Sequence, residues 1–300
     1  MTPTLLWIPA TLLAAAAQTA RNAMQRSLTA TLGTVGASQV RFLYGLPFAL
    51  LFLVGLVSVT GWSVPAPTPA FLAYVCAGAV TQILATVLML AAMRERSFAV
   101  TTAYIKTEPV QVAVFGIAVL GDHLSWLAAL AILVATAGVV LMALKPGMEK
   151  PTAAGLRPAA MGIGAGAFFA LSAIGFRGAI LQLAGASPVL AATTTLCWSL
   201  GVQSAMLALW MGLFDRRALA AIAAAWRPSL FAGFMGAFAS QFWFIGFSLT
   251  SAANVRTLAL VEVLFAQAVS RRLFDQSTSA REWAGMLMIV AGVALLMLAQ

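Results

Sequence analysis

The chain has 300 residues, of which 62% are hydrophobic and 8% are charged, with a formal net charge of +9 at pH 7. A soluble domain carries about 25% charged residues, so this composition predicts an all-α integral membrane protein with little room for a soluble domain. The basic residues lie in short loops and at helix ends rather than in one patch, which argues against nucleic-acid binding. One histidine and two cysteines form no metal-binding pattern, so neither a metal nor a cofactor is expected.

Ten segments are long and apolar enough to cross a bilayer, for which about 20 mainly apolar residues are needed. In chain order they are 4–26, 36–60, 69–92, 97–120, 124–144, 158–182, 187–213, 228–249, 252–273 and 281–299. The longest polar connection, KPGMEKPTAAGLRP, lies at the centre of the chain between the fifth and sixth segments. It divides the chain into two halves of five helices each, residues 1–148 and 149–300.

The distribution of Lys and Arg predicts that the second half is inverted relative to the first. Five is an odd number, so a tandem copy of five helices must enter the membrane in the opposite orientation. Lys and Arg occur in all the odd-numbered connections or at the segment ends beside them, and in none of the even-numbered connections. The positive-inside rule then places the odd-numbered connections in the cytoplasm and both termini outside. The predicted fold is therefore ten transmembrane helices in a 5+5 inverted-topology repeat around a central cavity.

The fourth segment carries the clearest functional signal, because Lys106 and Glu108 lie near its middle. An ionised side chain at the bilayer centre costs about 3 kcal/mol, so such residues are usually paired or turned toward a water-filled cavity. Glu108 shares one helix face with Thr101, Tyr104 and Gln111. Lys106 is expected to point roughly the opposite way. Pro109 frees a backbone carbonyl one turn earlier, which predicts a kink or hinge beside Glu108.

The pattern around Glu108 returns 154 residues later, with Glu262 at the same offset and without a gap. An acidic residue at corresponding places in two membrane halves is typical of a transporter built from a duplicated unit. The side chains predicted to line the cavity are Gln18, Arg21, Asn22, Arg41, Tyr74, Gln82, Tyr104, Lys106, Glu108, Gln111, Arg177, Gln241, Trp243, Arg256 and Glu262. Five of these are cations and two are acids, and the surplus favours a substrate that bears carboxylate or phosphate.

Structural roles remain open for several of these residues. The two glutamates could form buried ion pairs with Lys106, Arg177 or Arg256 instead of contacting substrate. Arg21, Arg177 and Arg41 could reach the headgroups from helix ends. The aromatic series in the eighth segment, from Phe231 to Phe247, could serve packing and lipid contact instead of lining a pocket.

Three stretches of the first half form an ordered series along the chain: VRFLYGLPFALL (40–51), AAMRERSFAVTTAYIKTEPVQVAVFGIAVLGD (91–122) and LAALAILVATAGVVLMAL (127–144). The second half repeats the last two elements with TSAANVRTLALVEVLFA (250–266) and WAGMLMIVAGVALLML (283–298). This series resembles the drug/metabolite transporter superfamily, and within it the ten-helix EamA-type proteins that include amino-acid exporters.

The resemblance implies a 5+5 inverted repeat with a cavity lined by helices 1–4 and 6–9, and with helices 5 and 10 packed outside. Members of this family generally keep both termini in the cytoplasm and carry basic residues in the second connection. Here the second connection, TGWSVPAPTP, has no basic residue. The orientation from the positive-inside rule therefore conflicts with the usual orientation of the family.

The expected function is alternating-access transport or export of small zwitterionic or anionic metabolites, amino acids in the first place, across the bacterial inner membrane. Proton coupling through Glu108 or Glu262 is one expected mode. Export of drugs or nucleotide-sugar-like solutes is the alternative, and an assembly subunit without transport is a further one. A membrane enzyme is disfavoured because no catalytic cluster is apparent. The expected partners are a small-molecule substrate and the lipid bilayer, and the chain is a monomer or a weak homodimer through its charge-free fifth and tenth helices.

Overall fold

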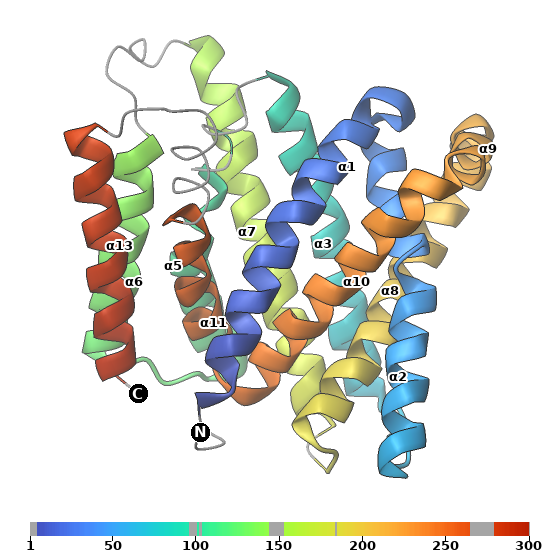
Figure 1. The fold of residues 1–300 in the computed structure, drawn as a ribbon, viewed down its shortest axis with the longest axis horizontal. Coiled ribbons are helices and arrows are strands. Elements are labelled where there is room, and N and C mark those ends of the chain that lie inside the picture. Colours follow the sequence, from blue (N-terminus) through green and yellow to red (C-terminus); the bar gives the residue numbers. More distant parts are fainter. Residues whose placement is uncertain are drawn as a thin grey trace.

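The computed structural model is an elongated bundle of helices, and within the part of the chain that it describes there is no strand (Figure 1). The described residues are 5–95, 101, 104–143, 153–183, 185–264 and 279–299. Six helices within these ranges are long and apolar enough to cross a membrane. Shorter apolar helices cover residues 108–120 and 126–142. The all-helical, membrane-spanning class predicted from composition is therefore confirmed.

The first two predicted segments are two helical stretches separated by a sharp break at Gly33. Helix α1 spans Trp7–Leu43 and bends at Gly33, whose φ of 67° and ψ of 179° lie in a region that essentially only glycine occupies. The second span, Val35–Thr60, consists of the part of α1 after this bend together with α2, Leu46–Thr60. The irregular connection that follows α2 leads into α3, Pro69–Glu95.

The fourth predicted segment, 97–120, is not one continuous helix. Within its described part, a turn at Lys106 and Thr107 precedes α5, Glu108–Phe115, which continues as the π-helix η2, Gly116–Leu120. Proline lacks an N–H group and is well suited to the first turn of a helix, so Pro109 accounts for a new helix that begins at Glu108. The fifth segment forms α6, Trp126–Ala143.

The second half follows the predicted segments closely, with one helix that was not predicted. Its elements are α7 (Ala153–Leu181), α8 (Pro188–Phe214), α9 (Arg216–Ala224), α10 (Trp226–Leu249), α11 (Ala252–Leu258), the 3-10 turn η3 (Ala259–Val261) and α13 (Ala280–Leu298). The short helix α9 begins at the N-cap Asp215, whose carboxylate accepts a hydrogen bond from Ala218 N. The predicted ninth segment, 252–273, is described only as far as residue 264, and the rest lies outside the described residues.

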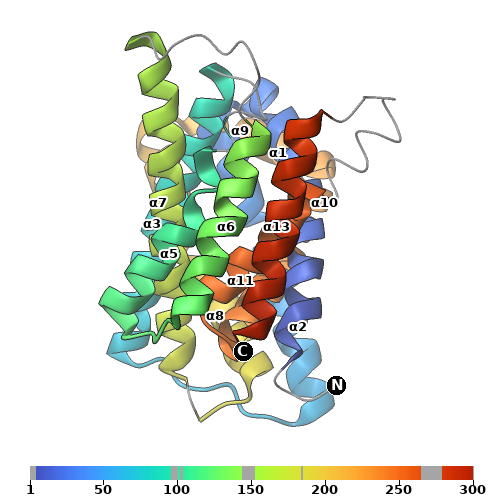
Figure 2. The ribbon, with the colours of Figure 1, turned by 90° about the vertical axis from the view of Figure 1, so that its left-hand side faces the viewer.

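The helices pack mainly in pairs drawn from different halves of the chain. Helix α1 packs against α10, α3 against α7, α6 against α13, α2 against α8, and α5 against α11. Figure 2 shows α6 and α13 side by side on the outer flank of the bundle. The start of α1 and the end of α13 lie at one end of the molecule, and α9 lies at the other (Figures 1 and 2).

Glycines allow the closest of these approaches. A Cβ on Gly78 of α3 would lie 2.7 Å from Cδ1 of the buried Phe176 ring on α7. A Cβ on Gly138 of α6 would lie 2.6 Å from the carbonyl oxygen of Gly285 on α13. Small residues at helix interfaces in membranes let backbones approach in this way. Helices α6 and α13 contact each other through this small-residue face. Their apolar side chains on other faces, such as Leu133 and Leu287, are exposed at the surface of the bundle.

Candidate functional site

A small cavity lies in the middle of the bundle and is lined by side chains from both halves. Its volume is about 50 Å³, which is room for roughly three to five water molecules at about 10–15 Å³ each. Six of the lining residues are ionisable: Arg21, Arg41, Lys106, Glu108, Arg256 and Glu262. All six were predicted cavity residues. The cavity is thus polar, charged and too small in this conformation for an organic solute.

Helix breaks bring the charged side chains of the first half into this cavity. Lys106 lies in the turn before α5, and Glu108 is the first residue of α5. The expectation that Lys106 and Glu108 point in opposite directions assumed a continuous helix and is wrong, because both residues line the cavity. In the second half, Arg256 belongs to the last turn of α11, and Glu262 directly follows the 3-10 turn η3.

Two ion pairs cross between the halves at the cavity wall. Lys106 Nζ contacts Glu262 Oε1, and Arg256 Nε lies 3.0 Å from Glu108 Oε1, although the latter two atoms are not aligned as a hydrogen bond. The side chains of both pairs are only about a tenth exposed, from 9% to 12%. Breaking a buried pair by removing one partner costs about 3–5 kcal/mol, because a buried charge is left without compensation. The two pairs therefore hold the first half to the second.

Aromatic rings surround the Arg256 guanidinium. Its Cζ lies 4.4 Å from the centroid of Trp243 and 5.4 Å from that of Phe247, both on α10. Trp243 is itself oriented by Nε1, which donates a 2.9 Å hydrogen bond to Gln18 Oε1 on α1. Trp243, Phe244 and Phe247 line the cavity, so part of the aromatic series of the eighth segment faces the site. Phe238 of the same series packs against Phe234 and Phe242 instead.

Two arginines from α1, Arg21 and Arg41, also line the cavity. Arg21 and Arg41 are each only 3% exposed. Their side-chain stems both pass over Gly236 of α10, where a Cβ would lie 3.2 Å from Arg41 Cγ and 3.7 Å from Arg21 Cδ. Arg41 Nε and Nη1 are buried without a hydrogen-bond partner among the described residues. With Lys106 and Arg256, the lining carries four cations against two carboxylates.

Amide side chains form a polar layer beside the charges. Gln203 Nε2 of α8 donates to Gln82 Oε1 of α3 at 2.7 Å, and Gln82 lines the cavity. Gln203 was not predicted, although a glutamine within an apolar helix is a signal that could have found it. Gln241 Nε2 donates to Thr193 Oγ1 at 2.8 Å, so this predicted residue joins α10 to α8 and does not belong to the cavity lining.

Several other predicted residues lie outside the cavity lining. Tyr74 packs its ring over Gly178, Tyr104 packs over Gly162, and Gln111 Nε2 donates to Thr107 Oγ1 at 3.4 Å. Asn22 belongs to α1, and its side chain lies outside the described parts of the structure. Pro109 is buried in the first turn of α5, at the break that the sequence predicted.

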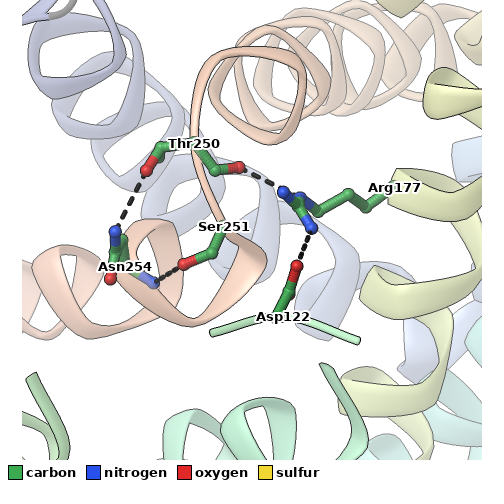
Figure 3. Close-up of polar contacts among 5 residues, drawn as sticks. All are labelled: Asp122, Arg177, Thr250, Ser251 and Asn254. Carbon is green, nitrogen blue, oxygen red and sulfur yellow. Dashed lines mark hydrogen bonds and ion pairs between the residues drawn. The ribbon is translucent and has the colours of Figure 1, made fainter. Parts of the chain in front are cut away.

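Arg177 forms a separate network at the end of the bundle where α10 meets α11 (Figure 3). Its Nη1 donates to Asp122 Oδ1 at 2.6 Å, and its Nε donates to the carbonyl oxygen of Thr250 at 3.1 Å. Asn254 Nδ2 donates to Thr250 Oγ1 at 3.0 Å. The prediction that Arg177 lines the central cavity therefore does not match its position. Asp122 was not predicted, although an acid directly after an apolar run is a recognisable signal.

These connections join the two halves at that end of the molecule. Asp122 belongs to the link between η2 and α6, whereas Arg177 is on α7 and Thr250 ends α10. The described residues contain no group of three His, Cys, Asp or Glu side chains that could hold a metal ion. The groups available at the centre are charged side chains and amide hydrogen-bonding groups.

Comparison with known proteins agrees with this architecture. The profile of the EamA-like transporter family matches residues 5–144. A solved structure titled "Crystal structure of protein" is similar over 99% of this chain and 96% of its own, with a TM-score of 0.68 and 16% sequence identity. At that identity the likeness concerns the fold alone. No curated protein matches the sequence.

Proposed function

We propose that the bundle is a secondary transporter of small zwitterionic or anionic metabolites. Residues 5–144 match the EamA-like transporter family. The family consists of membrane transporters of small solutes, and the substrate class is our proposal. The observation that carries it is the charge of the cavity, where four cations surround two carboxylates that are both already paired. Arginine and lysine at such a site favour carboxylate or phosphate groups. Amino acids are the first candidates.

The helix pairing supports a ten-helix fold of two inverted repeats, residues 1–148 and 149–300. Under an exchange of the two halves, the first span corresponds to α7 and α3 corresponds to α10. The packing of α1 on α10 then becomes the packing of α7 on α3, and both are observed. The pairs α6–α13, α2–α8 and α5–α11 each map onto themselves. An approximate twofold relation of this kind is what inverted repeats produce.

Alternating access would let the solute reach the cavity from one side at a time. The Arg177 network ties the two halves together at the end of the bundle where α1 begins and α13 ends. The central cavity of about 50 Å³ is too small for an amino acid. Loading the site therefore requires the halves to separate at one end. The positive-inside rule assigns the opposite end, with α9 and its arginines, to the cytoplasm of a bacterial inner membrane.

Transport by purified protein in liposomes tests this proposal. Vesicles loaded in turn with radiolabelled amino acids, organic acids, nucleotide sugars and a quaternary ammonium dye would be assayed for efflux with and without a pH gradient. We expect efflux of at least one carboxylate-bearing solute and its loss in Glu108→Gln and Glu262→Gln. Glu282→Gln is the matched control, because this glutamate caps the start of α13 at the surface.

The outcomes separate the candidate functions. Efflux of the dye alone would contradict the proposal and favour a drug exporter, because a cationic solute requires unpaired acids. Efflux of a carboxylate solute that is unchanged in both glutamate variants would keep the transport function and remove these residues from the site. Stimulation by a pH gradient that disappears in one variant would identify the proton-coupling glutamate.

A further inference from the structure

Arg41 is a buried cation whose hydrogen-bonding groups are incompletely used. It is 3% exposed and lines the central cavity. Its Nε and Nη1 have no hydrogen-bond partner among the described residues, and its guanidinium Cζ lies 5.2 Å from the ring centroid of the adjacent Phe42. Buried polar groups in native proteins are nearly always hydrogen-bonded, so an exception at a cavity wall indicates a group able to bind a ligand.

The electrostatic surroundings indicate the sign of that ligand. Arg21 lies beside Arg41, since the stems of both side chains cover Gly236. No carboxylate of the described residues is within ion-pair distance of Arg41, whereas Glu108 and Glu262 are occupied by Arg256 and Lys106. A guanidinium binds carboxylate through charge-assisted N–H hydrogen bonds, and Nε and Nη1 of Arg41 are both available as donors.

The same pairing makes a substrate amine compete with protein cations for both carboxylates of the cavity. Both carboxylates already face cations from the opposite half, and Glu262 Oε2, which has no hydrogen-bond partner among the described residues, belongs to the carboxylate that Lys106 contacts. An amine would also enter a space lined by four cations. We propose that Arg41 is the anion subsite of the transporter and that the site recognises the carboxylate of its substrate without requiring an amine. This inference rests on the proposed transport function and narrows it to organic anions.

Matched ligands that differ in one group would test the claim. The wild-type protein in detergent would be titrated with leucine, with its deaminated analogue isocaproate and with its decarboxylated analogue isoamylamine. The corresponding series of phenylalanine, hydrocinnamate and phenethylamine would probe the aromatic wall. Binding would be measured by calorimetry. We expect each carboxylate to bind as tightly as its amino acid, within about threefold, and neither amine to bind.

Variants at and around Arg41 connect that selectivity to the subsite. Each hydrogen bond to a charged group increases binding affinity by about a factor of ten or more. We therefore expect Arg41→Gln to weaken carboxylate binding about 100-fold and Arg41→Lys to weaken it about tenfold. Gly236→Ala should weaken it severalfold by displacing the Arg41 stem while its charge is kept. Arg216→Gln on the exposed helix α9 removes the same charge at the surface and should have no effect.

Each result bears on the inference in a defined way. Binding of an amino acid together with failure of its deaminated analogue would overturn the anion-only claim and leave the proposed transport function standing. Unchanged affinity in both Arg41→Lys and Gly236→Ala, which keep the positive charge, would remove Arg41 as the subsite even if Arg41→Gln does not fold. Failure of all six ligands to bind the wild-type protein would overturn this inference, and transport in the liposome assay would decide the proposed function separately.

Discussion

Replacing Glu108 with glutamine removes one partner of a buried ion pair and keeps the shape of the side chain. At the observed 3.0 Å between Arg256 Nε and Glu108 Oε1, two unit charges attract by about 5–6 kcal/mol at an effective dielectric constant of 20. The variant leaves Arg256 buried against Trp243 and Phe247, and its glutamine still presents a side-chain oxygen to the guanidinium, so less than the full attraction is lost. We therefore expect a net destabilisation of about 3 kcal/mol, in keeping with other broken buried pairs.

Thermal unfolding in detergent, followed by circular dichroism, would measure this effect. A loss of about 3 kcal/mol corresponds to a decrease in Tm of about 6–12 °C. Glu282→Gln at the surface should decrease Tm far less. The double variant Glu108→Gln/Arg256→Gln should recover at least half of the loss, because no buried charge is then left without a partner. A single variant as stable as the wild type, or a double variant less stable than the sum of the two singles, would refute the reasoning.

Three further predictions concern packing and the connection between the halves. Asp122→Asn should weaken the contact with Arg177 and increase the labelling of a cysteine introduced at that end, and equal labelling would contradict a closing role. Gly78→Ala places a Cβ 2.7 Å from an aromatic ring and should cost about 1–3 kcal/mol of unfolding free energy, whereas Gly55→Ala, with nothing within 4 Å, should cost nothing measurable. Gly33→Ala should destabilise by about 1–3 kcal/mol through its backbone conformation, and an unchanged Tm would refute this.

The membrane helices could be predicted from the sequence wherever apolar length decides the structure. The predicted 69–92, 187–213 and 228–249 agree with α3, α8 and α10 to within three residues at each end. Prediction was poorer where local backbone chemistry overrides hydropathy. Gly33 does separate the first two predicted segments, but helix continues through most of the predicted connection before it, and the turn before Glu108 divides the fourth predicted segment.

The site could be predicted in part, because buried charge in a bilayer is conspicuous. The repeat offset identified Glu108 and Glu262, and both line the cavity. Which cation pairs with which acid could not be predicted, since the pairs form between halves and depend on where the helices break. The prediction that Arg177 lines the cavity failed for a related reason. Its partner Asp122 lies in a connection, and hydropathy does not show how a connection folds back on a helix.

The crossed arrangement of the ion pairs has a mechanical consequence. An ion pair within one half would survive any movement of the halves past each other, whereas Lys106–Glu262 and Arg256–Glu108 join the first half to the second. Movement that separates the segments around α5 and α11 must therefore expose or re-pair buried charges, at a cost of several kcal/mol per pair. An anion entering the cavity supplies an alternative partner for the cations and reduces that cost. Under the proposed function, the bound anion and the two glutamates compete for the same cations. Occupancy of the site is thereby coupled directly to movement of the two halves.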